Sequence, residues 1–238
     1  MLDALVRSVR SIGAVGTLAA LALAGCSGEK TSGPGETVPI NPYLEDVMLG
    51  DANAPVEMIE YASLACPHCR DFWKQDMPRL KADYIDTGKV KYILRDFPTA
   101  PAELSIAAAA IARCTGKDGY FAVVDDVFDN FYELIDAVQS GAGAAPMLLE
   151  IGTRHGLTPD EVKSCVNSPR IQSHIDKVVR DAQRDVSGTP TVFINGEKIT
   201  SPNYESVTAA IDAALGVTAE PSPAAEAPST GEQPEDEG

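Results

Sequence analysis

Residues 56–69 read VEMIEYASLACPHC and set two cysteines, Cys66 and Cys69, just after a β-rich run. The run 56–61 is typical of a strand, and residues 65 to about 87 favour helix. Two cysteines three residues apart on a first helical turn face the same side, close enough to form a small disulfide ring. The stretch therefore predicts a strand that leads into a helix with a pair of sulfurs at its start.

A helix start favours an anionic sulfur at Cys66. The free N–H groups and the positive dipole end there stabilise a thiolate over a thiol. Pro67 has no N–H and presets the helical backbone, and a protonated His68 adds positive charge. Such surroundings lower the pKa of a thiol from about 8.5 to roughly 3.5–7.5. A stabilised thiolate makes the disulfide a stronger oxidant, with Cys66 as the exchanging sulfur and Cys69 as the sulfur that resolves the mixed disulfide.

Two other uses of the cysteine pair are less favoured. A structural zinc site needs four ligands, usually from a second paired motif, whereas Cys114 and Cys165 are single cysteines in separate helical stretches. A purely structural disulfide between Cys66 and Cys69 would stabilise little, because the loop it closes is short. We expect neither a metal nor another cofactor.

The remaining elements alternate in a way that defines the fold class. Residues 89–95 alternate as a second strand, 101–186 have a helical pattern, and a last helix follows near 204–215. Between them, 191–194 and 197–200 are predicted strands joined by the Asn-Gly turn signal. Strands from both ends of the chain form one sheet only if the helical block is an insertion. The order predicts an α/β fold with an inserted all-helical subdomain.

A proline stands directly before the third predicted strand, in Gly188-Thr189-Pro190. This position invites a cis peptide bond. A cis bond would leave the Thr189 backbone exposed beside the sulfur, able to pair with an extended substrate strand. An ordinary trans proline in a turn is the alternative.

Together, the Cys-Pro-His-Cys motif, Thr189-Pro190 and the helical insertion resemble the DsbA-like disulfide oxidoreductases of bacterial envelopes, which have a thioredoxin-like fold. The resemblance covers about Val47 to Leu215. It implies a nucleophile, a resolving cysteine, a thiolate-stabilising histidine and a cis-proline at Cys66, Cys69, His68 and Pro190.

Glu60 matches the buried acidic residue of that family. It shares a strand face with Val56 and Met58. A carboxyl kept near neutrality by burial can pass a proton to Cys69. An edge or surface glutamate is the alternative.

Two further cysteines, Cys114 and Cys165, resemble a disulfide found in the helical domain of some relatives. Each lies on an apolar helix face, and Thr158 to Glu161 form a capping box ahead of the second. Two buried free thiols remain the alternative. His155 and His174 have no partner that the sequence identifies, and we expect both to be solvated.

The N-terminus is typical of a secretory signal, with Arg7 and Arg10 ahead of an apolar run at 12–24. At ~1.5 Å per residue this run covers about 20 Å as a helix, short of the roughly 30 Å of a bilayer core. Leu-Ala-Gly before Cys26 resembles the bacterial lipoprotein box, which implies cleavage there and acylation of Cys26. An uncleaved membrane helix, or cleavage and release, are the alternatives.

We therefore expect a signal peptide at 1–25, a flexible tether at 26–38, one domain at 39–216 and an acidic tail at 217–238. The tail carries six acidic residues and no Lys or Arg from position 218 onward. The formal net charge of −16 argues against nucleic-acid binding, which needs a basic face.

The favoured function is an oxidase that donates its disulfide to reduced or unfolded exported polypeptides. We expect a monomer, lipid-anchored on the periplasmic side of the inner or outer membrane and recycled by a membrane redox partner. A reductase or isomerase of the same fold is one alternative, since direction depends on the partner. A non-enzymatic, lipid-anchored peptide-binding scaffold is the other.

Overall fold

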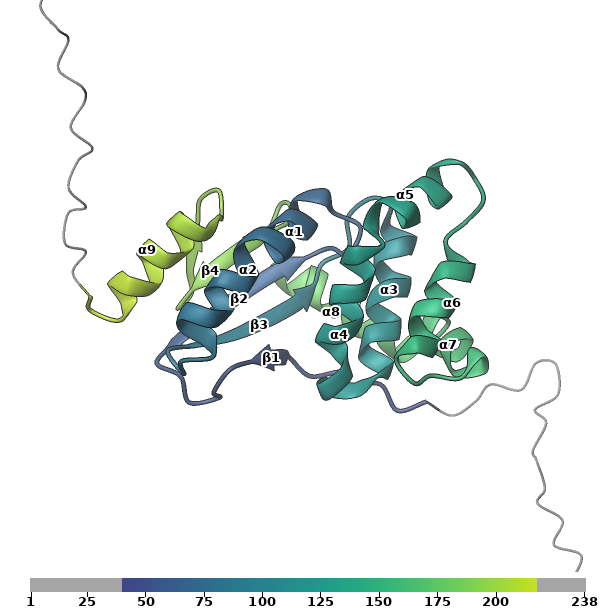
Figure 1. Ribbon diagram of the computed structural model, residues 1–238, viewed down its shortest axis with the longest axis horizontal. Coiled ribbons are helices and arrows are strands. Elements are labelled where there is room, and N and C mark those ends of the chain that lie inside the picture. The colour runs from purple at the N-terminus through teal and green to yellow at the C-terminus, as the bar shows by residue number, and fades with distance from the viewer. Residues whose placement is uncertain (1–39, 218–238) are drawn as a thin grey trace, which may run out of the picture. The chain divides into compact units, whose positions relative to one another are not determined.

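The computed structural model describes residues 40–217, which form a five-stranded sheet with helices on both faces (Figure 1). The sheet order is β1-β3-β2-β4-β5, with β2 and β3 parallel and the other pairs antiparallel. The strands are β1 (Val47–Leu49), β2 (Val56–Ala62), β3 (Val90–Asp96), β4 (Thr191–Ile194) and β5 (Glu197–Ile199). Strands from both ends of the chain thus share one sheet, which confirms the predicted fold class. The short strand β1 was not predicted.

The predicted signal peptide, Cys26, the tether and residues 218–238 of the tail lie outside the described residues. Within the described range, no helix has the length and apolar character needed to cross a bilayer.

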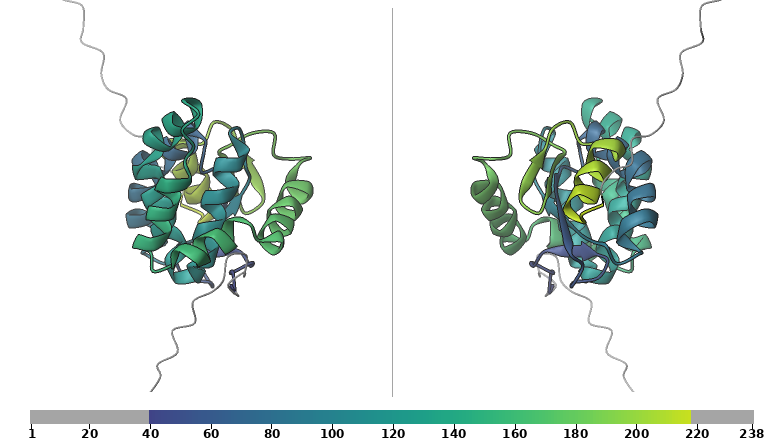
Figure 2. Two further views of the ribbon diagram at one scale, coloured as in Figure 1. Left: turned by 90° about the vertical axis from the view of Figure 1, so that its right-hand side faces the viewer. Right: turned by 90° about the vertical axis from the view of Figure 1, so that its left-hand side faces the viewer.

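Strand β2 buries one face completely and sets the side on which the site forms. Val56, Met58, Glu60 and Ala62 are buried, and the residues between them are partly exposed. A helical rod covers the buried face and consists of α1 (Pro67–Asp71), the π-helical η1 (Phe72–Asp76), α2 (Met77–Leu80) and the π-helical η2 (Lys81–Ile85). The last helix, α9 (Tyr204–Ala214), packs against α2, and α8 (Pro169–Ala182) lies across the opposite face of the sheet (Figure 2).

The β4–β5 hairpin turns as its sequence predicts. Asn195 and Gly196 have φ angles of 47° and 86°. Positive φ at both central residues is the requirement of the tight turn that asparagine and glycine favour. The Asn195 side chain also accepts a hydrogen bond from the Glu57 N–H at 2.8 Å, which ties the turn to β2.

The predicted helical insertion, 101–186, contains helices α3 to α8. The first five are α3 (Ala102–Cys114), α4 (Gly116–Asp129), α5 (Phe131–Gln139), α6 (Ala145–Arg154) and α7 (Pro159–Val166). Helix α3 packs against α4, α6, α7 and α8, and Figure 1 shows α3 to α7 gathered beside the sheet. The contact face of α3 consists largely of buried alanines, and small side chains let neighbouring helices approach closely.

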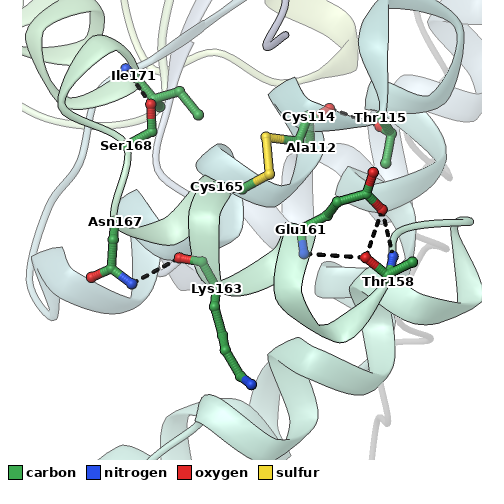
Figure 3. Close-up of a disulfide and its surroundings, with 10 residues drawn as sticks. All are labelled: Ala112, Cys114, Thr115, Thr158, Glu161, Lys163, Cys165, Asn167, Ser168 and Ile171. Carbon is green, nitrogen blue, oxygen red and sulfur yellow. Dashed lines mark hydrogen bonds between the residues drawn. A yellow bond between two sulfur atoms is a disulfide. The ribbon is translucent and has the colours of Figure 1, made fainter. Parts of the chain in front are cut away.

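A disulfide joins Cys114 at the end of α3 to Cys165 in α7 (Figure 3). The capping box at the start of α7 is formed, with the Thr158 N–H donating to Glu161 at 2.7 Å and the Glu161 N–H donating back at 3.2 Å. The bridged cysteines are 51 residues apart. Closing a loop of that length restricts the unfolded chain by about 4 kcal/mol in the chain-entropy model.

A buried ion pair connects the helical block to the sheet. Arg113 Nε donates to Asp96 Oδ2 at 2.6 Å, and the Tyr120 hydroxyl donates to Asp96 Oδ1 at 2.7 Å. Arg113 and Asp96 are 1% and 2% exposed, and Arg113 also donates to the Tyr43 carbonyl at 3.0 Å. The polar groups of the pair are therefore satisfied despite burial, as such pairs require.

The expectation that both histidines are solvated is wrong. His155 is partly buried, and its Nε2 lies 3.0 Å from Asp126 Oδ2. His174 is partly buried in a cleft under α8, beside Asp46 and Arg95. Burial and the positive charge of Arg113 lower the pKa of His174.

Candidate active site

The two cysteines of the motif lie where β2 gives way to α1. Cys66 is the residue that precedes the first helical turn, and Pro67 is the first residue of the helix. Both cysteines are free thiols in this structure, with Cys66 7% and Cys69 0% exposed. The predicted strand-to-helix junction thus places a slightly exposed cysteine next to a fully buried one.

The protein lowers the pKa of Cys66 from the ordinary 9.0 to about 5. The largest cause is the hydrogen bond from Cys69, followed in the same direction by the Thr189 side chain and the N–H groups of Cys69 and His68, while burial opposes them. The pKa of Cys69 is raised well above its usual value, by burial first and then by its interactions with Cys66 and Glu60. At neutral pH one sulfur is therefore a thiolate and the other a thiol.

His68 acts on this sulfur through its backbone. Its N–H contributes to the low pKa of Cys66, and its side chain is exposed to solvent. The expected influence of the imidazole stays a prediction.

The Thr189–Pro190 peptide bond is cis and lies directly beside Cys66. When Cys66 is protonated, its thiol donates to the Thr189 carbonyl at 3.3 Å. The Thr189 hydroxyl is buried without a hydrogen-bond partner, and is therefore free to donate to the sulfur once that sulfur is anionic. The sequence did not identify a second cis bond, Ala100–Pro101, which stands directly before α3.

A cleft of about 490 Å³ opens next to this loop. His68 and Phe72 line it on the helix side, and Thr189, Pro190 and Pro202 line it on the loop side. A chain joined to Cys66 and paired with the Thr189 backbone would extend over this cleft.

Glu60 is buried on the β2 face that the helical rod covers, which rules out an edge or surface position. Its pKa is raised from 4.5 to about 7, mainly by burial, while a hydrogen bond from Tyr92 opposes the rise and the Cys66 charge adds to it. The Tyr92 hydroxyl donates to Glu60 Oε2 at 2.7 Å. A carboxyl with this pKa can exchange a proton near neutral pH.

Sequence reasoning missed three residues that hold the site together. Tyr92 lies in a predicted strand, but its pairing with Glu60 depends on the parallel register of β2 and β3. Ser63 donates its N–H to Cys69 Sγ at 3.5 Å, and Ser105 of α3 accepts from the Leu64 N–H at 3.1 Å. These serines tie the loop before Cys66 to the helical block.

The described residues hold no group of three or more His, Cys, Asp or Glu side chains arranged to bind a metal ion. The Cys114–Cys165 bridge lies in the helical block, away from the motif, and links α3 to α7.

The chain is similar in sequence to known protein families. A family model described as Thioredoxin matches residues 43–213. A Rickettsia felis protein named "Putative protein-disulfide oxidoreductase" is 32% identical over 173 residues, covering 71% of this chain and 60% of its own length. A Bacillus anthracis protein named "Probable disulfide bond formation protein D" is 30% identical over 180 residues, covering 73% of this chain and 80% of its own. The match therefore spans less than two thirds of the Rickettsia relative.

Solved structures show the same fold. The crystal structure of Wolbachia pipientis alpha-DsbA1 superimposes with a TM-score of 0.62 and 31% identity, over 74% of this chain and 93% of the other. BdbD from Bacillus subtilis, in its oxidised form, gives a TM-score of 0.62 at 19% identity, over 76% of this chain and 99% of the other. The second likeness concerns the fold alone.

Proposed function

We propose, since the chain belongs to the thioredoxin superfamily and to its DsbA-like members, that it is an envelope thiol–disulfide oxidoreductase that donates its Cys66–Cys69 disulfide to exported proteins. The observation that carries the proposal is the difference between the two sulfurs. The pKa of Cys66 is about 5, and that of Cys69 is raised above its ordinary value.

This difference gives the exchange a direction. A substrate thiolate attacks Cys66 of the enzyme disulfide, the Cys66–Cys69 bond breaks, and Cys69 leaves with the electron pair and takes up a proton. The second substrate thiolate then attacks the substrate sulfur of the mixed disulfide, and Cys66 leaves as a thiolate. The substrate loses two electrons and gains a disulfide, and the enzyme becomes the dithiol.

The low pKa of Cys66 favours that final state. Relative to a thiol of pKa 9.0, a pKa of about 5 stabilises the dithiol form about a hundredfold at neutral pH. At about 30 mV per tenfold for a two-electron couple, this raises the reduction potential by about 60 mV. The reduced enzyme is stabilised, so its disulfide is the better oxidant.

Glu60 supplies the proton for Cys69 in this scheme. The group is buried behind the pair, and a pKa of about 7 leaves a protonated fraction at neutral pH. Its acid form protonates Cys69 as that sulfur leaves, so the negative charge moves from the sulfur to the Glu60 carboxylate, which accepts the Tyr92 hydrogen bond.

The cellular setting belongs to the proposal as well. Residues 1–25 direct export, and acylation of Cys26 anchors the chain on the periplasmic side of a membrane. Its substrates are reduced or unfolded exported polypeptides, and a membrane redox partner restores the disulfide.

A trapping experiment tests the activity. In Cys69→Ala the enzyme has no second sulfur with which to displace a bound polypeptide from Cys66, so we expect exported proteins to accumulate on Cys66 of the full chain and to be released by reductant. The double variant Cys66→Ala/Cys69→Ala is the matched control and captures nothing. If the single variant also captures nothing, the scaffold alternative gains support. Equilibration with glutathione then decides direction, because a potential near about −270 mV, as in thioredoxin, would indicate a reductase.

A further inference from the structure

Tyr92 is a buried polar residue that has no role in the exchange steps described above. It lies in the middle of β3 with 0% exposure. Its hydroxyl donates to Glu60 Oε2 at 2.7 Å. The rings of Trp73 and Phe121 pack around it, with centroids 6.3 Å and 6.0 Å from its own. The packing restricts the ring, so the hydroxyl stays directed at the carboxyl.

The groups that face Glu60 come from three elements. β3 contributes Tyr92, the start of α1 contributes Cys66 and Cys69, and α4 contributes Tyr120. The Tyr120 hydroxyl is committed to Asp96 at 2.7 Å. Among the described residues, the Tyr92 hydroxyl therefore makes the only side-chain hydrogen bond to Glu60, and no cation pairs with this carboxyl.

We propose that Tyr92 is the positioning residue of Glu60: its hydroxyl holds the carboxyl near Cys69, so that one group both gives and takes the proton of the buried sulfur. The inference rests on the proposed function. It assigns a role to a residue of β3 that touches neither substrate nor sulfur.

The two directions of proton transfer need both forms of Glu60. When the enzyme oxidises a substrate, the acid protonates the Cys69 thiolate and becomes a carboxylate. When a disulfide oxidant recharges the enzyme, Cys66 first forms a mixed disulfide with it. The carboxylate then takes the Cys69 proton, Cys69 attacks Cys66, and the oxidant's sulfur leaves with the electron pair. A carboxyl held permanently neutral would serve only the first direction.

The energetics agree with this role. Burial raises the pKa of Glu60 and the Tyr92 hydrogen bond lowers it, with a resulting pKa of about 7. A hydrogen bond from a buried donor favours the charged form of a carboxyl. Without the hydroxyl we expect the midpoint of Glu60 to rise by about one pH unit.

The direct test is the carboxyl titration of Glu60 in the reduced mature chain, followed by carbon-13 NMR. Glu60→Gln identifies the resonance. We expect Tyr92→Phe, which keeps the ring, to raise the midpoint by about one pH unit. Tyr120→Phe is the matched control, because it removes a hydroxyl bonded to a different buried carboxylate, and it leaves the midpoint in place.

The kinetic test follows the Cys69 step alone. The reduced protein is mixed with glutathione disulfide, quenched with acid at intervals, and the Cys66–glutathione mixed disulfide is counted by mass spectrometry. In Tyr92→Phe the ionised fraction of Glu60 at neutral pH should fall from about half to about a tenth. The Cys66–glutathione mixed disulfide should then disappear about fivefold more slowly than in the unmodified chain. In the Glu60→Gln background, Tyr92→Phe has no further effect on this rate.

The inference is overturned if Tyr92→Phe folds and the titration midpoint of Glu60 is unchanged. It is also overturned if Tyr92→Phe slows loss of the mixed disulfide equally with and without Glu60→Gln. If Tyr92→Phe does not fold, fluorotyrosine placed at position 92 provides the second test, because its more acidic hydroxyl lowers the midpoint. The titration needs no substrate. If Cys69→Ala traps no substrate but Tyr92→Phe still shifts the titration midpoint of Glu60, the proposed activity is refuted. If the trap succeeds but the midpoint does not shift, only the role of Tyr92 is refuted.

Discussion

Replacing Glu60 by glutamine should stabilise the reduced protein in a pH-dependent way. The carboxyl has a pKa of about 7 in the fold against an ordinary 4.5. A pKa raised by folding favours the native state below about pH 4.5, and this advantage disappears as the pH rises toward 7, because the unfolded chain is then free to ionise. At about 1.36 kcal/mol per pH unit, the buried carboxyl lowers the free energy of unfolding by about 3 kcal/mol above pH 7.

Glutamine is never charged and can still accept the Tyr92 hydrogen bond, so Glu60→Gln removes that loss without opening a cavity. We expect a gain of about 3 kcal/mol in the free energy of unfolding near about pH 8, and little change near about pH 4. Urea denaturation of both proteins under reducing conditions at the two pH values measures the difference. A gain of equal size at both pH values would refute the reasoning, because it would show that the carboxyl does not titrate between them.

Two other predictions concern the framework. Replacing Cys114 and Cys165 together by alanine should lower the free energy of unfolding, measured by urea denaturation, by about 4 kcal/mol. The pKa of Cys66 should stay at about 5, and a shifted titration of its thiol would contradict a purely structural role for the bridge. Replacing Arg113 by methionine leaves the buried Asp96 carboxylate without its ion-pair partner and should lower the free energy of unfolding by about 3–5 kcal/mol. Adding Asp96→Asn should recover part of that loss. If the double variant is as unstable as the sum of the single ones, the two side chains do not act as a pair.

The sequence predicted the features that depend on local order. The cysteine pair follows a strand and opens a helix, so its placement needs only neighbouring residues. The Asn195-Gly196 hairpin and the capping box before Cys165 are likewise local signals that the structure contains. Strands at both ends of the chain, with a helical block between them, were enough to predict one sheet with an insertion.

The missed features depend on contacts between distant segments. The partner of Glu60 is 32 residues away and is brought close by strand register. Arg113 of α3 meets Asp96 of β3, which lies 17 residues earlier in the chain. Strand β1 has three residues, too few to show an alternating pattern. The histidines were expected in water because nothing near His155 in sequence points to Asp126, which lies 29 residues earlier.

Cys66 is a thiolate at neutral pH because the first turn of α1, Cys69 and Thr189 stabilise its charge. Thiolate ultraviolet absorbance of the reduced chain, recorded against pH with Cys66→Ser as the baseline, measures this directly. A titration midpoint near 5 is the predicted result. A midpoint near 9.0, the ordinary value for a cysteine, would contradict it and remove the basis for a disulfide donor.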